Sequence, residues 1–305
     1  MNGVIIATLV VGAVGIFVGI FLGIAAIQFR VEVDEKEVAV LAALPGNNCG
    51  GCGFPGCSGL AAAIAKGEAP VNQCPVGGEA VGKKIAEIMG VEVGDSVRKV
   101  AFVHCVGNPS VAKQNYEYSG HEDCRMAAFV PGGGPKGCTS GCLGFGTCVA
   151  ECPFDAIHIV NGVAQVDKEA CKACSKCVNV CPRHLIDLIP YDAQVSVACS
   201  SRDKGPAVMK VCSVGCIGCG LCEKNCPHDA IHVENNIARI DYDKCVGCGA
   251  CAEKCPKKII FDPHVPSDVT MEKKMKELAE AEAKKKAAAA AAAAKKAEAE
   301  AGKAV

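Results

Sequence analysis

The chain has 305 residues, 24 of them cysteines, and its formal net charge at pH 7 is −1. Aromatic residues make up 4% of the chain and tryptophan is absent, which is little for a protein built on a large apolar core. The balanced charge argues against a nucleic-acid partner. The cysteines indicate a chain that folds around disulfides, zinc or iron–sulfur clusters.

An uncharged apolar segment opens the sequence. No Asp, Glu, Lys or Arg occurs from Asn2 to Phe29, and the run from Val4 to Ile27 is apolar with interspersed glycines. As a helix, about 24 residues would span about 36 Å, enough to cross a hydrocarbon core of about 30 Å. Residues 1–30 therefore predict a transmembrane anchor. The alternative is a cleaved signal peptide, which has a basic start and a shorter apolar stretch.

The orientation of this anchor is predicted from charge and redox chemistry. Arg30 comes directly after the apolar run and favours a cytoplasmic location for the rest of the chain. Free thiols and low-potential clusters also belong in a reducing compartment. We therefore expect a single-pass protein of the cell (inner) membrane, with residues 31–305 on the cytoplasmic side.

A first set of four cysteines lies in residues 31–98, where a helix is predicted from Gly59 to Lys66. Glycines surround the cysteines and allow backbone amides to approach cluster sulfurs. The spacing, C-x2-C-x4-C-x16-C, predicts a single [4Fe–4S] cluster, with zinc as the alternative. The predicted ligands of this cluster 1 are Cys49, Cys52, Cys57 and Cys74.

Residues 99–135 read as a linker region that contains Cys105 and Cys124 and ends in a glycine-rich joint. Gly132, Gly134 and Gly137 have the spacing of a dinucleotide-binding fingerprint. The strand–turn–helix context that this fingerprint requires is missing. No NAD site is therefore expected in this chain.

An internal repeat is the strongest pattern. Cys152 begins Cys-Pro-Phe-Asp-Ala-Ile-His, and Cys226 begins Cys-Pro-His-Asp-Ala-Ile-His. Each is followed by a C-x2-C-x2-C-x3-C-P run, which starts at Cys171 or Cys245. The residues between alternate as in a β-hairpin, with turns predicted at Asn161-Gly162 and Asn235-Asn236. We interpret His158 and His232, in the strands, as structural or as tuning a potential.

The repeated unit resembles the bacterial two-cluster ferredoxin, in which the fourth cysteine of each run ligates the other cluster. The resemblance implies two tandem ferredoxin-like units, residues 136–200 and 201–264. Between Cys138 and Cys148 the spacing is looser than in ferredoxins because of a glycine-rich insertion. The implied ligands are Cys138, Cys142, Cys148 and Cys181 for cluster 2; Cys152, Cys171, Cys174 and Cys177 for cluster 3; Cys216, Cys219, Cys222 and Cys255 for cluster 4; and Cys226, Cys245, Cys248 and Cys251 for cluster 5.

Four cysteines remain after these assignments: Cys105, Cys124, Cys199 and Cys212. Four is the number that a sixth cluster needs, and buried thiols that act as small apolar residues are the alternative. Five [4Fe–4S] clusters are thus predicted, and six if this set binds one. Residues 265–305 form an Ala/Lys/Glu-rich tail, predicted to be helical or disordered. A partner-binding helix or attraction to an anionic membrane surface are further interpretations of the tail.

The order of these features resembles the RnfB family, a component of the Rnf ion-translocating ferredoxin:NAD⁺ oxidoreductase, over residues 1 to about 262. The resemblance implies an α+β, membrane-anchored electron-transfer protein that takes electrons from soluble reduced ferredoxin and passes them to other subunits of the complex. One alternative is a polyferredoxin-type subunit of another anaerobic redox complex. A zinc-bound interaction module and an enzyme with substrate at a cluster are the others.

Overall fold

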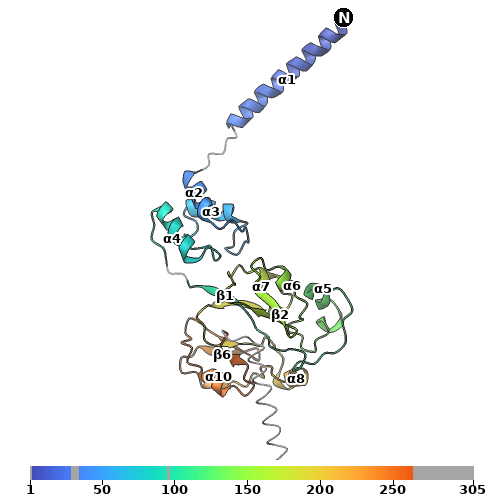
Figure 1. Ribbon diagram of the computed structural model, residues 1–305, viewed down its shortest axis with the longest axis vertical. Helices are drawn as coiled ribbons and strands as arrows, with labels where there is room; N and C mark the ends of the chain where they lie inside the picture. The colour runs from blue at the N-terminus through green and yellow to red at the C-terminus, as the bar shows by residue number, and fades with distance from the viewer. Residues whose placement is uncertain (1, 29–33, 95–96, 264–305) are drawn as a thin grey trace, which may run out of the picture.

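The computed structural model describes residues 2–28, 34–94 and 97–263. In chain order these residues form helix α1, a small helical domain, and a region of short helices and paired strands (Figure 1). The predicted mixture of helices and strands is confirmed. The predicted tail, residues 265–305, lies outside the described residues.

Helix α1 spans Asn2–Gln28 and has neither an acidic residue in its first turn nor a basic one in its last. Its apolar side chains are exposed, as Leu9 and Phe17 illustrate at 68% and 71%. No helix among the described residues has the length and hydropathy needed to cross a membrane. The helix is present where it was expected, but its prediction as a transmembrane anchor is not confirmed.

The small helical domain packs three helices around an apolar core: α2 (Glu35–Ala43), α3 (Cys57–Ala65) and α4 (Gly78–Met89). Val40, Leu60, Ile64 and Ile85 are almost fully buried in it. The helix predicted from Gly59 is confirmed as α3 and begins two residues earlier. It begins there because the side-chain oxygen of Asn48 accepts the Cys57 N–H at 2.8 Å, which satisfies an amide of the first turn.

Both predicted hairpins are confirmed. Strand β2 (Ile157–Val160) pairs antiparallel with β3 (Val163–Val166), and β6 (Ile231–Glu234) pairs with β7 (Ile237–Ile240). The two central turn residues have positive φ in each case: 50° and 73° at Asn161 and Gly162, and 50° and 65° at Asn235 and Asn236. Two positive φ values match the right-handed twist of the strands, so both turns suit two-residue hairpins.

Two further strand pairs join segments that are distant in sequence. Strand β1 (Lys99–Val103) pairs antiparallel with β4 (Ile186–Pro190), and β5 (Ser196–Val197) pairs with β8 (Ile260–Phe261). The predicted linker 99–135 therefore contains a strand of the first ferredoxin-like unit. Residues 196–200, predicted to end that unit, belong with the second. Sequence spacing could not show this, because each pair is defined by hydrogen bonds over a long sequence separation.

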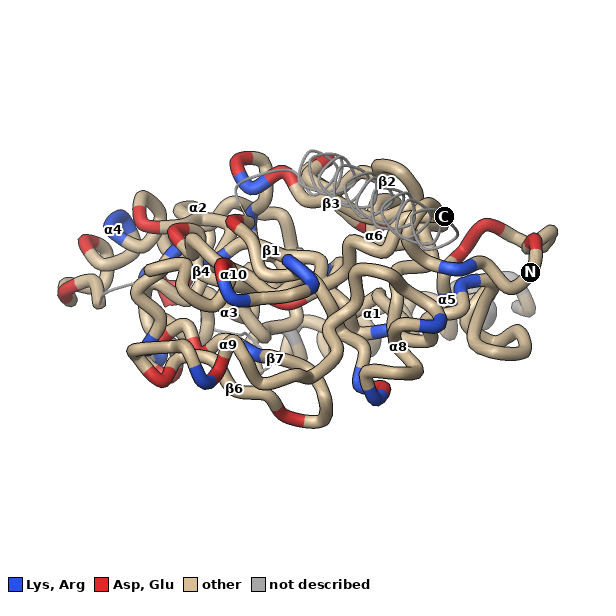
Figure 2. The backbone as a smooth tube through the Cα atoms, turned by 90° about the horizontal axis from the view of Figure 1, so that it is seen from below, with Lys and Arg blue, Asp and Glu red and all other residues tan. Residues whose placement is uncertain are grey.

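Short helices hold the cysteine motifs. Helices α6 (Thr147–Ala150), α7 (Lys176–Val180), α9 (Leu221–Lys224) and α10 (Ala250–Lys254) each follow a residue in the left-handed region and carry one motif cysteine. The remaining short helices are α5 (Cys124–Ala128), the 3₁₀ helix η1 (Pro131–Gly133) and α8 (Gly205–Val211). Each unit has its own buried core, and several motif cysteines belong to each. Acidic and basic positions are interspersed over the described residues (Figure 2).

Candidate iron–sulfur centres

The second ferredoxin-like unit brings together both of its predicted cysteine sets, each around its own cavity. The first cavity is lined by Cys216, Cys219, Cys222 and Cys255, and the second by Cys226, Cys245, Cys248 and Cys251. One cysteine of each set comes from the other motif: Cys255 in the first cavity and Cys226 in the second. This is the crossed arrangement of a two-cluster ferredoxin.

The first unit brings together the set predicted for cluster 3. Its cavity is lined by Cys152, Cys171, Cys174 and Cys177. Burial, followed by the neighbouring Cys171 and Cys174, raises the pKa of Cys177 to about 12. The backbone N–H of Ala101 on β1 donates to the Cys171 sulfur at 3.4 Å, so the strand from the predicted linker contacts this set.

The helical domain holds the first cysteine set on two loops and the start of α3. Burial raises the pKa of Cys74, the backbone amides of Gly77 and Val76 oppose the rise, and the charges of Cys52 and Cys57 add to it. The Gly77 N–H donates to the Cys74 sulfur at 3.4 Å. Cys49 is on the same loop as Cys52 and also lies near Cys174 of the first unit.

The remaining eight cysteines group differently from the prediction. Cys138, predicted as a ligand of cluster 2, lies in another cavity instead. That cavity is lined by Cys105, Cys138, Cys199 and Cys212. Cys124, predicted with the sixth set, lies beside Cys148: burial raises the pKa of Cys148 to about 12, and the thiols that raise it further are those of Cys142, Cys124, Cys181 and Cys177. The structure thus exchanges Cys124 and Cys138 between the two sets.

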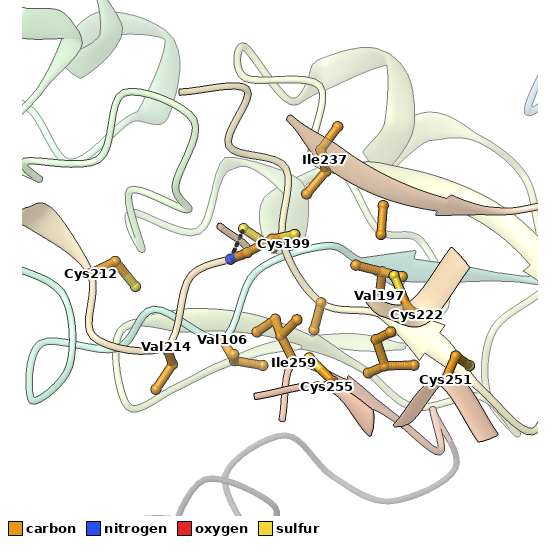
Figure 3. Close-up of a cluster of buried hydrophobic side chains, with 14 of the residues drawn as sticks. Val106, Val197, Cys199, Cys212, Val214, Cys222, Ile237, Cys251, Cys255 and Ile259 are labelled. Carbon is orange, nitrogen blue, oxygen red and sulfur yellow. Dashed lines mark hydrogen bonds between the residues drawn. The ribbon is translucent and has the colours of Figure 1, made fainter. Parts of the chain in front are cut away.

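The internal repeat supplies the physical reason for this exchange. Cys138 precedes Cys142 by the same four residues as Cys212 precedes Cys216. Cys105 and Cys199 each follow a strand, β1 or β5, by two residues. Equivalent hydrogen bonds join Cys142 to Cys105 in the first unit and Cys216 to Cys199 in the second. The Cys142 N–H donates to the Cys105 sulfur at 3.3 Å. The Cys216 N–H donates to the Cys199 sulfur at 3.4 Å, the dashed line of Figure 3. One set therefore takes two cysteines from each unit.

The other set is completed from outside the ferredoxin motif. Phe145 occupies the position, midway between Cys142 and Cys148, that Cys219 occupies between Cys216 and Cys222. Cys124 at the start of α5 replaces the missing thiol, and its N–H donates to the Thr147 hydroxyl at 2.7 Å. Position-by-position comparison of the repeats is the sequence signal that would have revealed the missing ligand at Phe145.

The donor sets fit [4Fe–4S] clusters. The cavity shared between the units is lined by four cysteines, as are the three cavities at the ferredoxin motifs. Backbone amides donate to several of the sulfurs, for example from Ala156 to Cys152 and from Ala230 to Cys226, both at 3.4 Å. Such bonds favour thiolates and set cluster potentials. Among the described residues, no three His, Cys, Asp or Glu side chains lie close enough to hold one metal ion.

The two repeat histidines lie beside carboxylates at the surface of the hairpins. His158 is 3.9 Å from Asp155, and His232 is 3.3 Å from Glu223. The side chains of the two histidines are 52% and 37% exposed. Their geometry fits a structural role at the start of each hairpin.

The hairpins, the crossed cysteine sets and their buried cavities define an iron–sulfur electron-transfer protein of the ferredoxin class. Residues 44–76 match the family described as "Putative Fe-S cluster", and residues 170–230 and 215–259 match the 4Fe-4S dicluster domain. These matches confirm the prediction of iron–sulfur domains in both parts of the chain.

The chain belongs to the RnfB family, the B components of the ion-translocating ferredoxin:NAD⁺ oxidoreductase complexes, as its resemblance predicted. It is 49% identical over 245 residues to the B component of the Na⁺-translocating complex of Acetobacterium woodii, and the match covers 80% of this chain and 73% of that protein. Identity is 43% to the B component of the ion-translocating oxidoreductase complex of Methanosarcina acetivorans, over 80% of this chain and 93% of the relative. Identity is 41% to the B component of the proton-translocating complex of Clostridium ljungdahlii, over 79% and 85%.

Proposed function

We propose that the chain accepts electrons from reduced ferredoxin and relays them to other subunits of a membrane-bound, ion-translocating ferredoxin:NAD⁺ oxidoreductase. The observation that carries this proposal is the gathering of cysteines around four cavities in the two ferredoxin-like units, with further cysteines close to Cys74 and to Cys148. Each bound [4Fe–4S] cluster would supply one-electron redox chemistry. The relatives are named as B components of ion-translocating oxidoreductase complexes, and this supports the proposed complex.

The proposed ligand sets retain four of the predicted clusters and revise the other two. Clusters 1, 3, 4 and 5 keep the ligands given above. The revised sets are Cys124, Cys142, Cys148 and Cys181 for cluster 2, and Cys105, Cys138, Cys199 and Cys212 for cluster 6. Cluster 6 would then join the two units, because each contributes half of its ligands.

The second unit is the proposed docking site for the donor. Cys219 and Cys248 are the exposed cysteines of the described residues, and Val246, two residues before Cys248, is 61% exposed. Cys248 has the repeat position of Cys174, which the helical domain covers through Gly51. An external redox protein would contact Cys248 as Gly51 contacts Cys174.

The helical domain is the proposed route out of the first unit. A Cβ atom on Gly51 would lie 2.8 Å from the carbonyl oxygen of Cys174, so the two backbones meet directly because Gly51 has no side chain. With the proposed ligand sets, cluster 1 would lie beside cluster 3. In Figure 1 the helical domain is drawn between α1 and the first unit, which suits electron transfer toward the membrane.

Membrane attachment through α1 is also part of the proposal. The uncharged, exposed surface of α1 supports it, with residues 31–305 on the cytoplasmic side and NAD⁺ reduced elsewhere in the complex. Membranes from cells that produce the full chain should retain it after alkaline carbonate extraction, whereas a chain lacking residues 1–30 should be released. Release of both chains would contradict the proposed membrane anchor and would leave the proposed electron relay unaffected.

The relay itself is tested with the full chain, purified without oxygen in detergent. About 24 irons per chain are expected for six clusters, against about 20 for five. Mixing with reduced ferredoxin should bleach the visible cluster absorbance, and dithionite provides the control for full reduction. Reduction by dithionite but not by ferredoxin would refute ferredoxin as the donor.

A further inference from the structure

Two cationic side chains of the first unit lie next to the revised cysteine sets: Lys136, which is buried, and Arg183, which is partly buried. Lys136 is 3% exposed and lines the cavity of Cys105, Cys138, Cys199 and Cys212. Its ammonium group donates to the carbonyl oxygen of Gly107 at 2.6 Å and also to that of Cys142. The ammonium group of Lys136 is therefore held between Gly107, two residues after Cys105 of the cluster 6 set, and Cys142 of the cluster 2 set.

Arg183 follows the Cys181-Pro182 pair and reaches back across the same two sets. Its guanidinium donates to the carbonyl oxygens of Cys138 at 2.6 Å and Gly141 at 3.1 Å, and also to that of Gly133. The thiols whose charge acts on it are, in decreasing order, those of Cys138, Cys105, Cys142 and Cys181. Both sets are represented among these four.

No carboxylate among the described residues forms an ion pair with either of these cations. Buried charges in proteins are usually paired, since an unpaired one is costly. Carbonyl oxygens are dipoles and do not neutralise a full charge. A cluster with four thiolate ligands is an anion, and it gains one more negative charge on reduction. Clusters bound by the two cysteine sets would therefore act as counter-ions of Lys136 and Arg183.

The second unit lacks this arrangement, although it has the same residue types. Lys210 is two residues before Cys212, as Lys136 is before Cys138, but its side chain is exposed. Lys257 follows Cys255-Pro256 as Arg183 follows Cys181-Pro182, is partly buried like Arg183, and donates to the Ser213 carbonyl at 2.9 Å. Water and salt screen charges at exposed positions far more than charges in the interior.

We propose that Lys136 and Arg183 raise the reduction potentials of clusters 2 and 6 above those of clusters 4 and 5. The two cations stabilise the reduced, more negative form of each neighbouring cluster and so make this pair the electron sink between the donor side and the helical domain. This inference rests on the proposed ligand sets. Lys136 and Arg183 act through their positive charges and do not ligate iron.

The test is an anaerobic redox titration of the full chain, followed by electron paramagnetic resonance, on Lys136→Met and Arg183→Gln. Lys210→Met is the matched control, because it removes a lysine from the equivalent, exposed position. Each test variant should change the oxidised-to-reduced ratio of two clusters at least tenfold at a fixed potential, which is about 59 mV toward lower potential. Lys136→Arg should restore the wild-type potentials, and Lys210→Met should leave them unchanged.

Iron counts separate this inference from the ligand sets on which it rests. Test variants with the full wild-type iron content and unchanged potentials would overturn the role of the cations while leaving the sets intact. A wild-type count of about 20 irons would instead remove cluster 6 from the proposal. If Lys136→Met does not load iron, Arg183→Gln and Lys136→Arg still give the potentials that decide the matter.

Discussion

In the second ferredoxin-like unit Cys219 stands between Gly218 and Gly220, and in the first unit Phe145 stands between Gly144 and Gly146. All four glycines have positive φ, from 63° to 82°. A Cβ on Gly144 or Gly218 would come within 3 Å of the carbonyl oxygen of the equivalent hairpin turn residue, Gly162 or Asn236. The loop therefore keeps one conformation whether or not its central residue is a ligand. The glycines determine the backbone, and the missing thiol can come from a different segment.

The largest effect is expected from moving the ligand back into the loop. Cys124→Ala should remove one cluster, about four irons, because α5 supplies the fourth thiol of that set. Adding Phe145→Cys to this variant should restore the lost irons, since the backbone at position 145 matches that at Cys219. Iron and acid-labile sulfide analyses measure both. Failure of Phe145→Cys to restore iron in a folded chain would show that the two loops differ.

A second prediction concerns the contact that covers Cys174 in the first unit, whereas the equivalent Cys248 is exposed among the described residues. Gly51→Val should push the helical domain away from the first unit, because a side chain there would overlap the Cys174 backbone. Reduction of cluster 1 after mixing with a donor should then slow by tenfold or more (~1.4 kcal/mol or more in activation free energy). Rapid freeze-quench spectroscopy measures this step.

Gly82→Ala is the matched control for that variant. Gly82 is buried in α4 of the same domain, and a Cβ there would meet only ordinary contacts at 3.5 Å. Equal rates in Gly51→Val and the wild type would show that electrons do not cross at this contact.

A third prediction tests the open surface of the second unit. Val246→Asp should slow reduction by ferredoxin about tenfold, roughly 1.4 kcal/mol, because a carboxylate would replace an exposed apolar contact beside the cluster. Lys172 has the equivalent position in the first unit, so Lys172→Asp is the control and should have little effect. Stopped-flow kinetics distinguish the two variants, and a slower rate in Lys172→Asp alone would move the docking site to the first unit.

The smallest effects are expected at the repeat histidines. His158→Gln and His232→Gln each remove an exposed contact with a carboxylate, which is worth about 0.5 kcal/mol or less. Thermal unfolding under anaerobic conditions should show nearly equal midpoints for both variants and the wild type. A shift of one cluster potential in either variant would support the alternative interpretation, that these histidines tune a cluster.

Local features of the fold were predictable, and long-range ones were not. The hairpins, the helix at Cys57 and the C-x2-C-x2-C runs follow from short-range spacing, because neighbouring residues determine turns and chelating loops. The crossed fourth ligand of clusters 3, 4 and 5 came from the resemblance to two-cluster ferredoxins. The pairing of β1 with β4 joins residues that are distant along the chain, and no local pattern records it. Cys105 could be assigned to Cys138 only once those strands were in place. The Phe145 position, by contrast, was available from comparing the two repeats.

Two double variants test the central claim, that one cluster is shared between the units, most directly. If Cys105 and Cys138 ligate the same cluster, Cys105→Ala with Cys138→Ala should cost about four irons per chain. Cys105→Ala with Cys124→Ala should then cost about eight, because two clusters each lose a ligand. The reverse, about eight and about four, would contradict the shared cluster and restore the ligand sets predicted from sequence spacing.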